Sequence, residues 1–450
     1  MKLNYKRTFF VGLAFLSIIS FWELYDSVVP KILDSTFNLG ETATGVVMAL
    51  DNVLALFLLP LIGAFSDRVN TRFGKRMPFI VGGTALAVVF IILMPIAERI
   101  DSLFLFLAAL GVVLIAMGLY RSPAVALMPD ITPKPLRSKA NAIINLMGTL
   151  GGIYTFVIIK FIYTEDGKNN IVVFISVAGL MVLAVTLLVL TIKEKKLTLL
   201  LKQEGEEIEK EVIEKEESAD LEERNRHQMA YMADEESETS PVKASGMPKD
   251  VKKSFIYIMS SIFLWFFAYN AVKTAFSRYA VKVWGLQDGQ FADPLMVALI
   301  TALLSYIPIG IISSKIGRKK TIIAGIILVT LSYICGFMIR DYSPIINVIF
   351  AFTGIGWAAI NVNSYPMVVE MCKGSDTGKF TGYYYTFSMA AQSITPILSG
   401  FLLENVSYHT LFPYAIFFSA ASFCTMLFVK HGDSKPMNKV NIIENFDMDD

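Results

Sequence analysis

The stretch GAFSDRVNTRFGKRMP, from Gly63 to Pro78, separates two apolar runs that are each long enough to cross a bilayer. The run before it, 42–62, contains one ionisable residue, Asp51, and the run after it, 77–97, contains none. Between them, Asp67 is the single acid beside four basic residues. A short basic loop between two spanning helices stays on the cytoplasmic side of the membrane. The stretch therefore predicts two membrane helices joined by a cytoplasmic turn.

The basic turn returns about half a chain later as GIISSKIGRKK, from Gly310 to Lys320. Ser314 takes the place that Asp67 has in the first copy. Arg137, after the fourth apolar run, and Lys379, after the tenth, repeat at a similar separation. An internal repeat of this kind is typical of secondary transporters that are built from two related halves.

The composition indicates a polytopic membrane protein. Hydrophobic residues make up 54% of the 450 residues, and the mean hydropathy of +0.55 is too high for a soluble domain of this size. A spanning helix needs about 20 mostly apolar residues, whereas barrel strands are shorter and alternate. Twelve segments qualify as helices: 8–31, 42–63, 77–97, 103–129, 138–163, 170–192, 254–283, 292–314, 321–340, 343–370, 379–403 and 409–430. We expect an all-α membrane protein whose twelve transmembrane helices form two pseudo-symmetric six-helix bundles.

The distribution of charge divides the chain into four parts. Residues 1–192 are the expected N-terminal six-helix bundle, and residues 254–431 are the expected C-terminal six-helix bundle. Between them, 193–253 is dense in Glu and Lys and is expected to be a cytoplasmic central loop, and 432–450 is expected to be a cytoplasmic tail. The central loop is either a regulatory or partner-binding segment or a solvated linker, and its composition favours the linker.

Lys and Arg gather in alternate loops and at both ends of the chain. This asymmetry predicts a multi-pass protein of the cell membrane with both termini in the cytoplasm. The net charge of +1 says nothing about nucleic acid, because the charges are segregated along the chain. The expected partners are the lipid bilayer and a small-molecule substrate, with no nucleic acid, and the protein is expected to be a monomer. The three cysteines lack metal-ligand spacing, and the chain lacks a GxxxxGK[ST] loop. We therefore expect no cofactor, no metal, no enzymatic activity and no ATP-driven transport.

Several stretches resemble known transporters. GAFSDRVNTRFGKRMPFI, 63–80, resembles the loop between the second and third helices of the major facilitator superfamily, in the form found in sucrose-transporter-like carriers. The segment from Trp22 to Asp26 resembles the acidic first helix of animal proton-coupled sugar carriers. The elements around Asp130 and Arg137 are similar to those that follow helix four in these carriers, and NTRFGK, 70–75, is similar to glycoside–pentoside–hexuronide cation symporters. The resemblance implies a transporter that works by alternating access and moves a sugar or glycoside together with H⁺. It fits Na⁺ as the coupling ion less well.

Ionisable residues inside the predicted spans are candidate ion-coupling residues, because charge in hydrocarbon is costly. Glu23 and Asp26 are three residues apart and share a face of the first helix. Asp51 lies near the middle of the second helix, and Arg121 lies in the cytoplasmic half of the fourth. One interpretation is that the acids bind the coupling proton or cation, while Arg121 pairs with one of them in one conformation only. The alternatives are a static buried ion pair, or acids that reach the outer headgroups.

Amide and aromatic side chains at a common depth are candidates for a substrate site, because sugar sites combine amide hydrogen bonds with an aromatic face. The alternative for each residue is a hydrogen bond between packed helices. The candidate substrate-binding residues are Tyr25, Asn270, Lys273, Trp357, Asn361, Asn363 and Gln392.

A third set of residues belongs to an expected cytoplasmic gate. Asp67 is expected to pair with Arg76 and to face the start of the eleventh helix near Gly378, which would hold the gate shut. The candidate gate residues are Gly63, Asp67, Arg68, Gly74, Arg76, Asp130 and Arg137.

These features predict a secondary active transporter, most simply a proton-coupled symporter of a sugar or glycoside. Sodium coupling is the second choice of ion. Two other classes stay open: an exporter or facilitator of another small organic solute, and a transporter-like sensor that uses 193–253 as its output.

Overall fold

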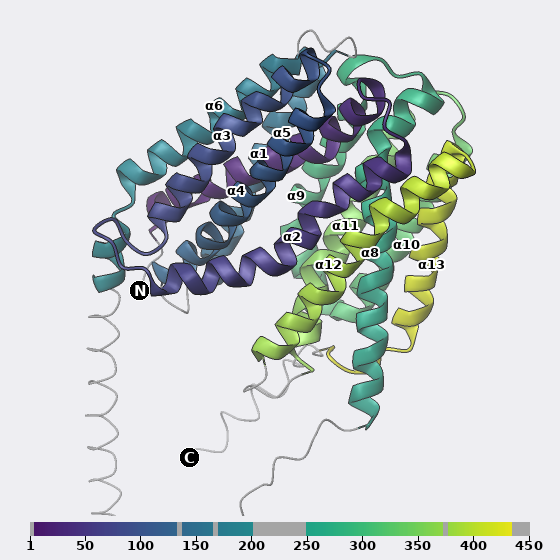
Figure 1. Ribbon diagram of the computed structural model, residues 1–450. Helices are drawn as coiled ribbons and strands as arrows, with labels where there is room; N and C mark the ends of the chain where they lie inside the picture. The colour runs from purple at the N-terminus through teal and green to yellow at the C-terminus, as the bar shows by residue number, and fades with distance from the viewer. Residues whose placement is uncertain (1–3, 133–136, 165–169, 201–248, 372–376, 434–450) are drawn as a thin grey trace, which may run out of the picture.

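The computed structural model describes most of the chain as helix (Figure 1). The described residues are 4–132, 137–164, 170–200, 249–371 and 377–433. Twelve helices in this part of the chain are long and apolar enough to cross a membrane. Their bounds are α1 Tyr5–Ser35, α2 Glu41–Arg68, α3 Met77–Arg99, α4 Leu103–Asp130, α5 Arg137–Ile162, α6 Asn170–Thr191, α8 Lys249–Trp284, α9 Ala292–Ile316, α10 Arg318–Met338, α11 Ile345–Val369, α12 Thr377–Asn405 and α13 Leu411–Leu427. Two short 3₁₀ helices, η2 Asp288–Phe291 and η4 Tyr408–Thr410, precede α9 and α13.

Each of the twelve predicted segments corresponds to one of these helices, so the all-α prediction is confirmed. The helix ends differ from the predicted ends by a few residues. The largest differences are at α2, which continues past Gly63 to Arg68, and at α8, which begins at Lys249. Both extensions are polar, and a basic residue such as Arg68 in the last turn stabilises a helix C-terminus. Helices in this protein thus extend beyond the apolar segments from which they were predicted.

The helices pack as two bundles whose contacts repeat. In the N-terminal bundle, α1 packs against α5 and α6, and α3 packs against α4 and α6. In the C-terminal bundle, α8 packs against α12 and α13, and α10 packs against α11 and α13. Each membrane helix of the second set makes the contacts of the helix six membrane spans before it, so that α8 corresponds to α1 and α10 to α3. This is the pseudo-symmetry that the repeated basic turns predict.

Glycine makes several of these helix contacts close. A Cβ atom on Gly151 of α5 would lie 2.0 Å from the backbone oxygen of Leu16 on α1. The Ser20 hydroxyl of α1 also donates to the Gly151 carbonyl oxygen at 2.9 Å. In the C-terminal bundle, a Cβ atom on Gly354 of α11 would lie 2.1 Å from the backbone oxygen of Ala298 on α9. Such close contacts hold helices together where lipid provides no hydrophobic drive for association.

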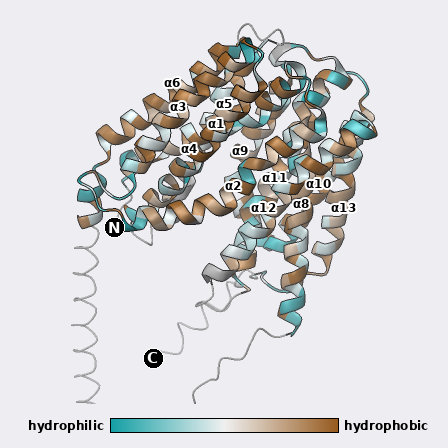
Figure 2. Ribbon diagram, in the orientation of Figure 1, coloured by the Kyte–Doolittle hydropathy of each residue, from teal (hydrophilic) through white to brown (hydrophobic). Residues whose placement is uncertain are grey.

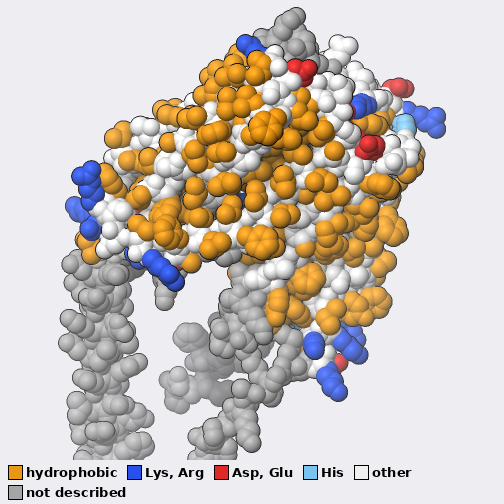
Figure 3. All heavy atoms as spheres, in the orientation of Figure 1, with side chains coloured by type: hydrophobic (Ala, Val, Ile, Leu, Met, Phe, Trp, Pro, Cys, Tyr) orange, Lys and Arg blue, Asp and Glu red, His pale blue; other side chains and the backbone are white. Residues whose placement is uncertain are grey.

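The surface carries a broad apolar belt. Figures 2 and 3 show hydrophobic residues over the middle of the molecule, with Lys and Arg side chains gathered at its ends. Many large apolar side chains are exposed; Phe161 and Ile307, for example, are each 76% exposed. An apolar surface of this extent matches the hydrocarbon of a bilayer and not water. The molecule is therefore built as a multi-pass membrane protein.

The two ends of the molecule differ in how the bundles meet. We call the end that carries the turns between α2 and α3 and between α9 and α10 the basic end, and the other the opposite end. The bundles contact each other through α1 with α8, α2 with α12, and α5 with α9. Near the opposite end, a Cβ atom on Gly45 of α2 would lie 2.1 Å from the backbone oxygen of Pro396 on α12. Toward the basic end, the two bundles lie apart (Figure 1).

Candidate transport site and gates

A cluster of three charged side chains joins α1 of one bundle to α8 of the other. Lys273 Nζ lies 2.8 Å from Asp26 Oδ2 and 3.4 Å from Glu23 Oε1. The Lys273 side chain is 28% exposed, and those of Glu23 and Asp26 are 9% and 16% exposed. The spacing of three residues places both acids on one face of α1. Because two carboxylates face one ammonium group, the cluster has one net negative charge when all three groups are ionised.

Asp51 and Arg121 form a second polar group, inside the N-terminal bundle. Both line a pocket between α1, α2 and α4, with the residues Trp22, Ala55, Leu58, Leu59, Leu114, Met117 and Gly118. The Arg121 guanidinium lies 5.7 Å from the centre of the Trp22 ring, and the Asn52 amide donates to Asp51 Oδ1 at 2.7 Å. None of the ion pairs between described residues includes Arg121.

Arg121 is expected to pair with one of the acids Glu23, Asp26 and Asp51 in one conformation only. In this conformation Lys273 is the cation beside Glu23 and Asp26. The physical reason is depth. Arg121 lies in the half of α4 toward the basic end, whereas Glu23 and Asp26 lie in the half of α1 toward the opposite end. Arg121 instead shares its pocket with Asp51.

The candidate substrate residues of the C-terminal bundle come from α8, α11 and α12. Tyr269 stacks on Trp357, with ring centres 3.7 Å apart and ring planes 4° apart. Asn270, Asn363 and Gln392 each donate an amide N–H to a carbonyl four residues earlier on the same helix. In this conformation the orientation of each amide is set by its own helix.

Two further candidates have different surroundings. Tyr25 is 1% exposed, and its hydroxyl donates to the Met48 carbonyl oxygen of α2 at 3.2 Å. This contact is the interhelical hydrogen bond that stood as the alternative to substrate binding. Asn361 is half-buried on α11.

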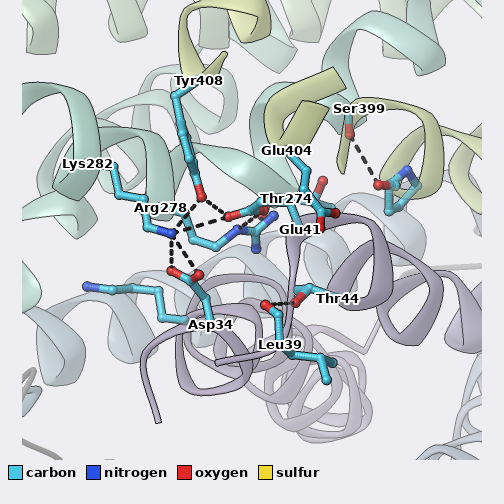
Figure 4. A network of polar contacts seen from close by, with 12 residues as sticks. Asp34, Leu39, Glu41, Thr44, Thr274, Arg278, Lys282, Ser399, Glu404 and Tyr408 are labelled. Carbon is cyan, nitrogen blue, oxygen red and sulfur yellow. Dashed lines mark hydrogen bonds and ion pairs between the residues drawn. The ribbon is translucent and has the colours of Figure 1, made fainter. Parts of the chain in front are cut away.

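A polar network joins the bundles at the opposite end (Figure 4). Arg278 Nε of α8 donates to Glu41 Oε2 of α2 at 2.7 Å, and both side chains are at most 5% exposed. Lys282 Nζ lies 2.6 Å from Asp34 Oδ2 of α1 and donates to the Tyr408 hydroxyl oxygen at 2.7 Å. The Tyr408 hydroxyl donates in turn to Glu41 Oε1. The network links α1 and α2 to α8 and η4.

Two more contacts flank this network. Glu404 Oε2 of α12 accepts the Thr42 backbone N–H at 2.7 Å, and Lys160 Nζ of α5 lies 2.7 Å from Asp293 Oδ1 of α9. No sequence pattern marked the residues of the opposite-end network as functional. The charged residues of the network lie near helix ends, where a charged side chain is usually solvated and so gives no functional signal in the sequence. Glu41, for example, is the first residue of α2. Only the packing of the two bundles brings these groups together.

At the basic end, Arg76 joins α2, α3 and α4 of the N-terminal bundle. Its side chain is 6% exposed and pairs with Asp67 of α2 and, at 2.8 Å, with Asp130 of α4. Its Nη1 atom also donates to the Gly63 carbonyl oxygen at 3.5 Å. Burial lowers the pKa of the Arg76 guanidinium, but Asp130 and Asp67 raise it more, so the net shift is upward. The guanidinium stays charged throughout the physiological pH range.

The turn between α2 and α3 ends in a capped helix N-terminus. Gly74 has a φ angle of +123°, a conformation that only glycine adopts readily. The carboxylate of Glu194 then accepts the backbone N–H groups of Lys75, Arg76 and Met77 at 2.7–3.1 Å. A carboxylate in this position satisfies free donors and interacts favourably with the helix dipole.

The C-terminal bundle repeats this arrangement. Arg318 at the start of α10 pairs with Glu370 at the end of α11. Asp433 Oδ1, after α13, accepts the backbone N–H groups of Arg318 and Lys319 at 2.6 and 3.3 Å. The sequence analysis missed Glu194 and Asp433; the pattern that could have found them is an acid soon after the last apolar helix of each half.

The remaining predicted gate residues are only partly described. Arg68 ends α2 and is exposed. The side chain of Arg137, and those at the start of α12 near Gly378, lie outside the described residues. Across the described part of the chain, no group of three or more His, Cys, Asp or Glu side chains is placed to hold a metal ion.

Comparisons with known proteins agree with this architecture. An uncharacterized MFS-type transporter, MJ1317 of Methanocaldococcus jannaschii, is 24% identical over 437 residues, which cover 94% of this chain and 95% of that protein. The probable nitrate transporter NarT of Staphylococcus epidermidis is 23% identical over 193 residues, 43% of this chain and 47% of NarT, so that match spans about half of the relative. Among solved structures, a POT family transporter in complex with a thioalcohol-conjugated peptide has a TM-score of 0.68 at 13% identity, covering 99% of this chain and 97% of that one.

A family profile matches both halves of the chain. The profile of the Major Facilitator Superfamily matches residues 11–305 and 258–442. These matches include the helices of both bundles, the charged cluster between α1 and α8, and the basic turns. The chain therefore belongs to the Major Facilitator Superfamily and is a secondary transporter.

Proposed function

We propose that this protein is a proton-coupled symporter that moves a sugar or glycoside by alternating access. The observation that carries the proposal is the cluster of Glu23, Asp26 and Lys273, which lies between the two bundles with Glu23 buried and the other two side chains partly buried. The proposal adds a coupling ion, a substrate class and residue roles to the family assignment.

The charge of the cluster favours proton coupling. Two carboxylates and one ammonium group leave one negative charge, whereas Asp51 and Arg121 in the neighbouring pocket balance each other. Net charge inside a membrane protein is costly, and one proton on either carboxyl of the cluster makes the site neutral. A neutral substrate preserves that balance. The charge balance of the cluster therefore favours a sugar over an ionic solute.

The position of the cluster provides a means of coupling. Lys273 belongs to the C-terminal bundle, and Glu23 and Asp26 belong to the N-terminal bundle. When the bundles rock, the distances from Lys273 Nζ to the two carboxylates change. A carboxylate that loses its ammonium partner in a low-dielectric site takes up a proton. Proton binding and conformation are thereby linked.

The side chains near the cluster suit a carbohydrate. Tyr269, one turn before Lys273 on α8, stacks on Trp357 of α11, and both are half-buried. Aromatic faces bind the C–H face of a sugar ring, and the amides of Asn270 and Asn361 can exchange hydrogen bonds with hydroxyl groups. These side chains, and not the relatives, support the substrate class.

We place the basic end and both termini in the cytoplasm, in accordance with the distribution of Lys and Arg. The bundles meet at the opposite end, so this conformation then faces the cytoplasm. Labelling of a cysteine at Asn70, in intact cells, by a reagent that does not cross the membrane would contradict this orientation.

The test is uptake of a panel of labelled sugars into proteoliposomes, with an imposed pH gradient or an imposed Na⁺ gradient. We expect a pH gradient that is acidic on the uptake side to drive accumulation of one or more sugars, and an uncoupler to abolish it. Sugar that equilibrates across the membrane at a rate independent of both gradients would indicate a facilitator. Sugar binding without flux would indicate a sensor. Either result contradicts the proposal.

The coupling residue is tested by neutral variants. Glu23→Gln should retain substrate exchange and lose uphill accumulation, because exchange needs no net movement of protons. Asp26→Asn and then Asp51→Asn are the next candidates, and Asp341→Asn, an exposed acid at the opposite end, is the control. If all three buried variants accumulate substrate at the wild-type level, none of these residues couples transport to protons.

A further inference from the structure

A buried carboxyl group lies at the opposite end of the N-terminal bundle, away from the transport site. Glu98, near the end of α3, is 6% exposed, and Asn170, the first residue of α6, is 1% exposed. Asn170 Nδ2 donates to Glu98 Oε1 at 2.8 Å. Thr36, at the C-cap of α1, donates its hydroxyl to the same oxygen at 3.5 Å. Three helices therefore meet at one carboxyl group.

Two oxygen atoms of this pair have no hydrogen-bond donor. Glu98 Oε2 and Asn170 Oδ1 are both buried and both without a partner. None of the ion pairs between described residues includes Glu98. A buried acceptor without a donor destabilises a protein, and the penalty is larger when the acceptor is charged. Glu98 Oε2 and Asn170 Oδ1 both lack a donor.

One proton supplies what both atoms lack. When a carboxylate and a primary amide face each other, the amide N–H satisfies one carboxylate oxygen, and the second carboxylate oxygen is left against the amide oxygen. We propose that Glu98 binds a proton on Oε2 and donates it to Asn170 Oδ1, which closes a ring of two hydrogen bonds. The proton comes from solvent, and no other bond forms or breaks. A metal cation suits the site less, because it would need about six oxygen ligands and two are open.

The charges around the pair are few. Arg99, on the same helix, is the charged side chain that acts electrostatically on Glu98. The partners from α1 and α6 are the uncharged Thr36 and Asn170, and Asp101, in the turn before α4, is exposed. Residues 165–169, which precede α6, lie outside the described part of the chain.

The site connects proton binding to the opposite-end network. Thr36 follows Asp34 by two residues, and Asp34 pairs with Lys282 of the other bundle. Loss of the proton places a carboxylate against the amide oxygen and weakens the junction of α1, α3 and α6. The stabilisation from the closed ring is therefore present at low pH and is lost as the pH rises. This proton site lies within one bundle and does not depend on the proposed substrate or coupling residues.

The test uses the purified full-length protein and two measurements. The first is the infrared carbonyl band of protonated carboxyl groups near neutral pH. The second is the melting temperature between about pH 5 and about pH 9. We expect Glu98→Gln, which mimics the protonated acid, to remove one component of the band. We also expect this variant to lose the wild-type fall in melting temperature, a few degrees, as the pH rises.

A swap variant tests the ring itself. Glu98→Gln combined with Asn170→Asp exchanges the acid and the amide, so the ring can form again; the band component and the pH dependence should return. Asp101→Asn is the matched control, because Asp101 is an exposed acid nearby whose φ of +52° asparagine tolerates. This control should change neither measurement.

Three outcomes would overturn the proposal. If Glu98→Gln leaves the carboxyl band unchanged, Glu98 is ionised and a bound water supplies the missing donors. If the pH dependence of the melting temperature persists in Glu98→Gln, another group causes it. If replacing N-methylglucamine by Na⁺ raises the melting temperature of the wild type and not of Glu98→Gln, the oxygens bind a cation.

Discussion

The ion pairs at the two ends of the molecule differ in what they join. At the opposite end they join the two bundles, as Arg278 of α8 does with Glu41 of α2. At the basic end the ion pairs between described residues stay inside one bundle: Arg76 pairs with Asp130 in the first half, and Arg318 pairs with Glu370 in the second. Pairs within a bundle persist when it moves as a rigid body, whereas pairs between bundles must break for that end to open. We therefore propose that the opposite-end network acts as a gate in this conformation and that the basic-end pairs brace their own bundles.

The largest expected effect is at the buried pair between the bundles. Arg278→Gln removes the close cation of the nearly inaccessible Glu41 carboxylate and leaves it with Lys282, whose Nζ lies 3.8 Å from Glu41 Oε1. Removing one partner of a buried pair costs about 3–5 kcal/mol, and here the cost falls on the conformation in which the bundles meet. Spin labels at Ser35 and Val406, in a background without the three native cysteines, should move apart.

The double variant Glu41→Gln with Arg278→Gln is the control for this first prediction. It leaves no unpaired charge, so it should recover most of the wild-type label distance. An unchanged distance in the single variant would mean that the pair does not hold the opposite end closed.

The next largest effect is expected at the crossing of α2 and α12. Gly45→Ala places a Cβ atom 2.1 Å from the Pro396 carbonyl oxygen, so the helices must separate. Overpacking of this kind costs about 1–3 kcal/mol, and it should widen the same label distance and slow transport. Gly82→Ala is the matched control, because no atom lies within 4 Å of its new Cβ position. A wild-type distance in Gly45→Ala would contradict the close crossing.

A smaller effect is expected for Asp67→Asn at the basic end. Asp67 is 59% exposed, and Asp130 still pairs with Arg76 when Asp67 is neutral. The loss should be about 0.2–1 kcal/mol, which slows translocation by up to about fivefold. Because Asp67 lies within one bundle, equilibrium substrate binding and the label distance at the opposite end should stay as in the wild type. Loss of binding in a folded variant would contradict the expectation that Asp67 lies outside the substrate site.

The smallest effect is expected for the exposed pair between α5 and α9. The side chains of Lys160 and Asp293 are 36% and 23% exposed, so solvent and salt screen their attraction. Lys160→Gln should change the opposite-end equilibrium by under about 0.5 kcal/mol, and the change should vanish at high salt. If Lys160→Gln shifted the opposite-end equilibrium as much as Arg278→Gln does, the size of these effects would not depend on the burial of the ion pair.

The sequence predicted the twelve helices because the hydrophobic requirement of a spanning segment is local. An apolar run such as 77–97 has to become a helix in a bilayer, whatever packs against it, because every backbone group must be bonded internally. The helix ends were less accurate, as at Arg68 of α2, because polar residues extend a helix once it leaves the hydrocarbon. The spacing of Glu23 and Asp26 also predicted their common face, since helical periodicity is local.

The partners of these side chains could not be read in the same way. The sequence suggested Lys273 as a substrate residue and Arg121 as a partner for one of the acids, but it did not indicate that Lys273 pairs with Glu23 and Asp26. A pairing depends on the depth at which two helices present their side chains and on which helices face each other. Neither quantity is a property of one segment.

Local chemistry in the chain by itself thus determined that this protein is helical, crosses a membrane twelve times and is duplicated. The tertiary structure alone decided which charges cross between the bundles and which remain within one, as in the contrast between Glu41 with Arg278 and Asp67 with Arg76. The reason is physical: hydrophobicity and helical periodicity act within a segment, whereas an ion pair requires two segments, distant in the chain, to be brought within about 4 Å of each other.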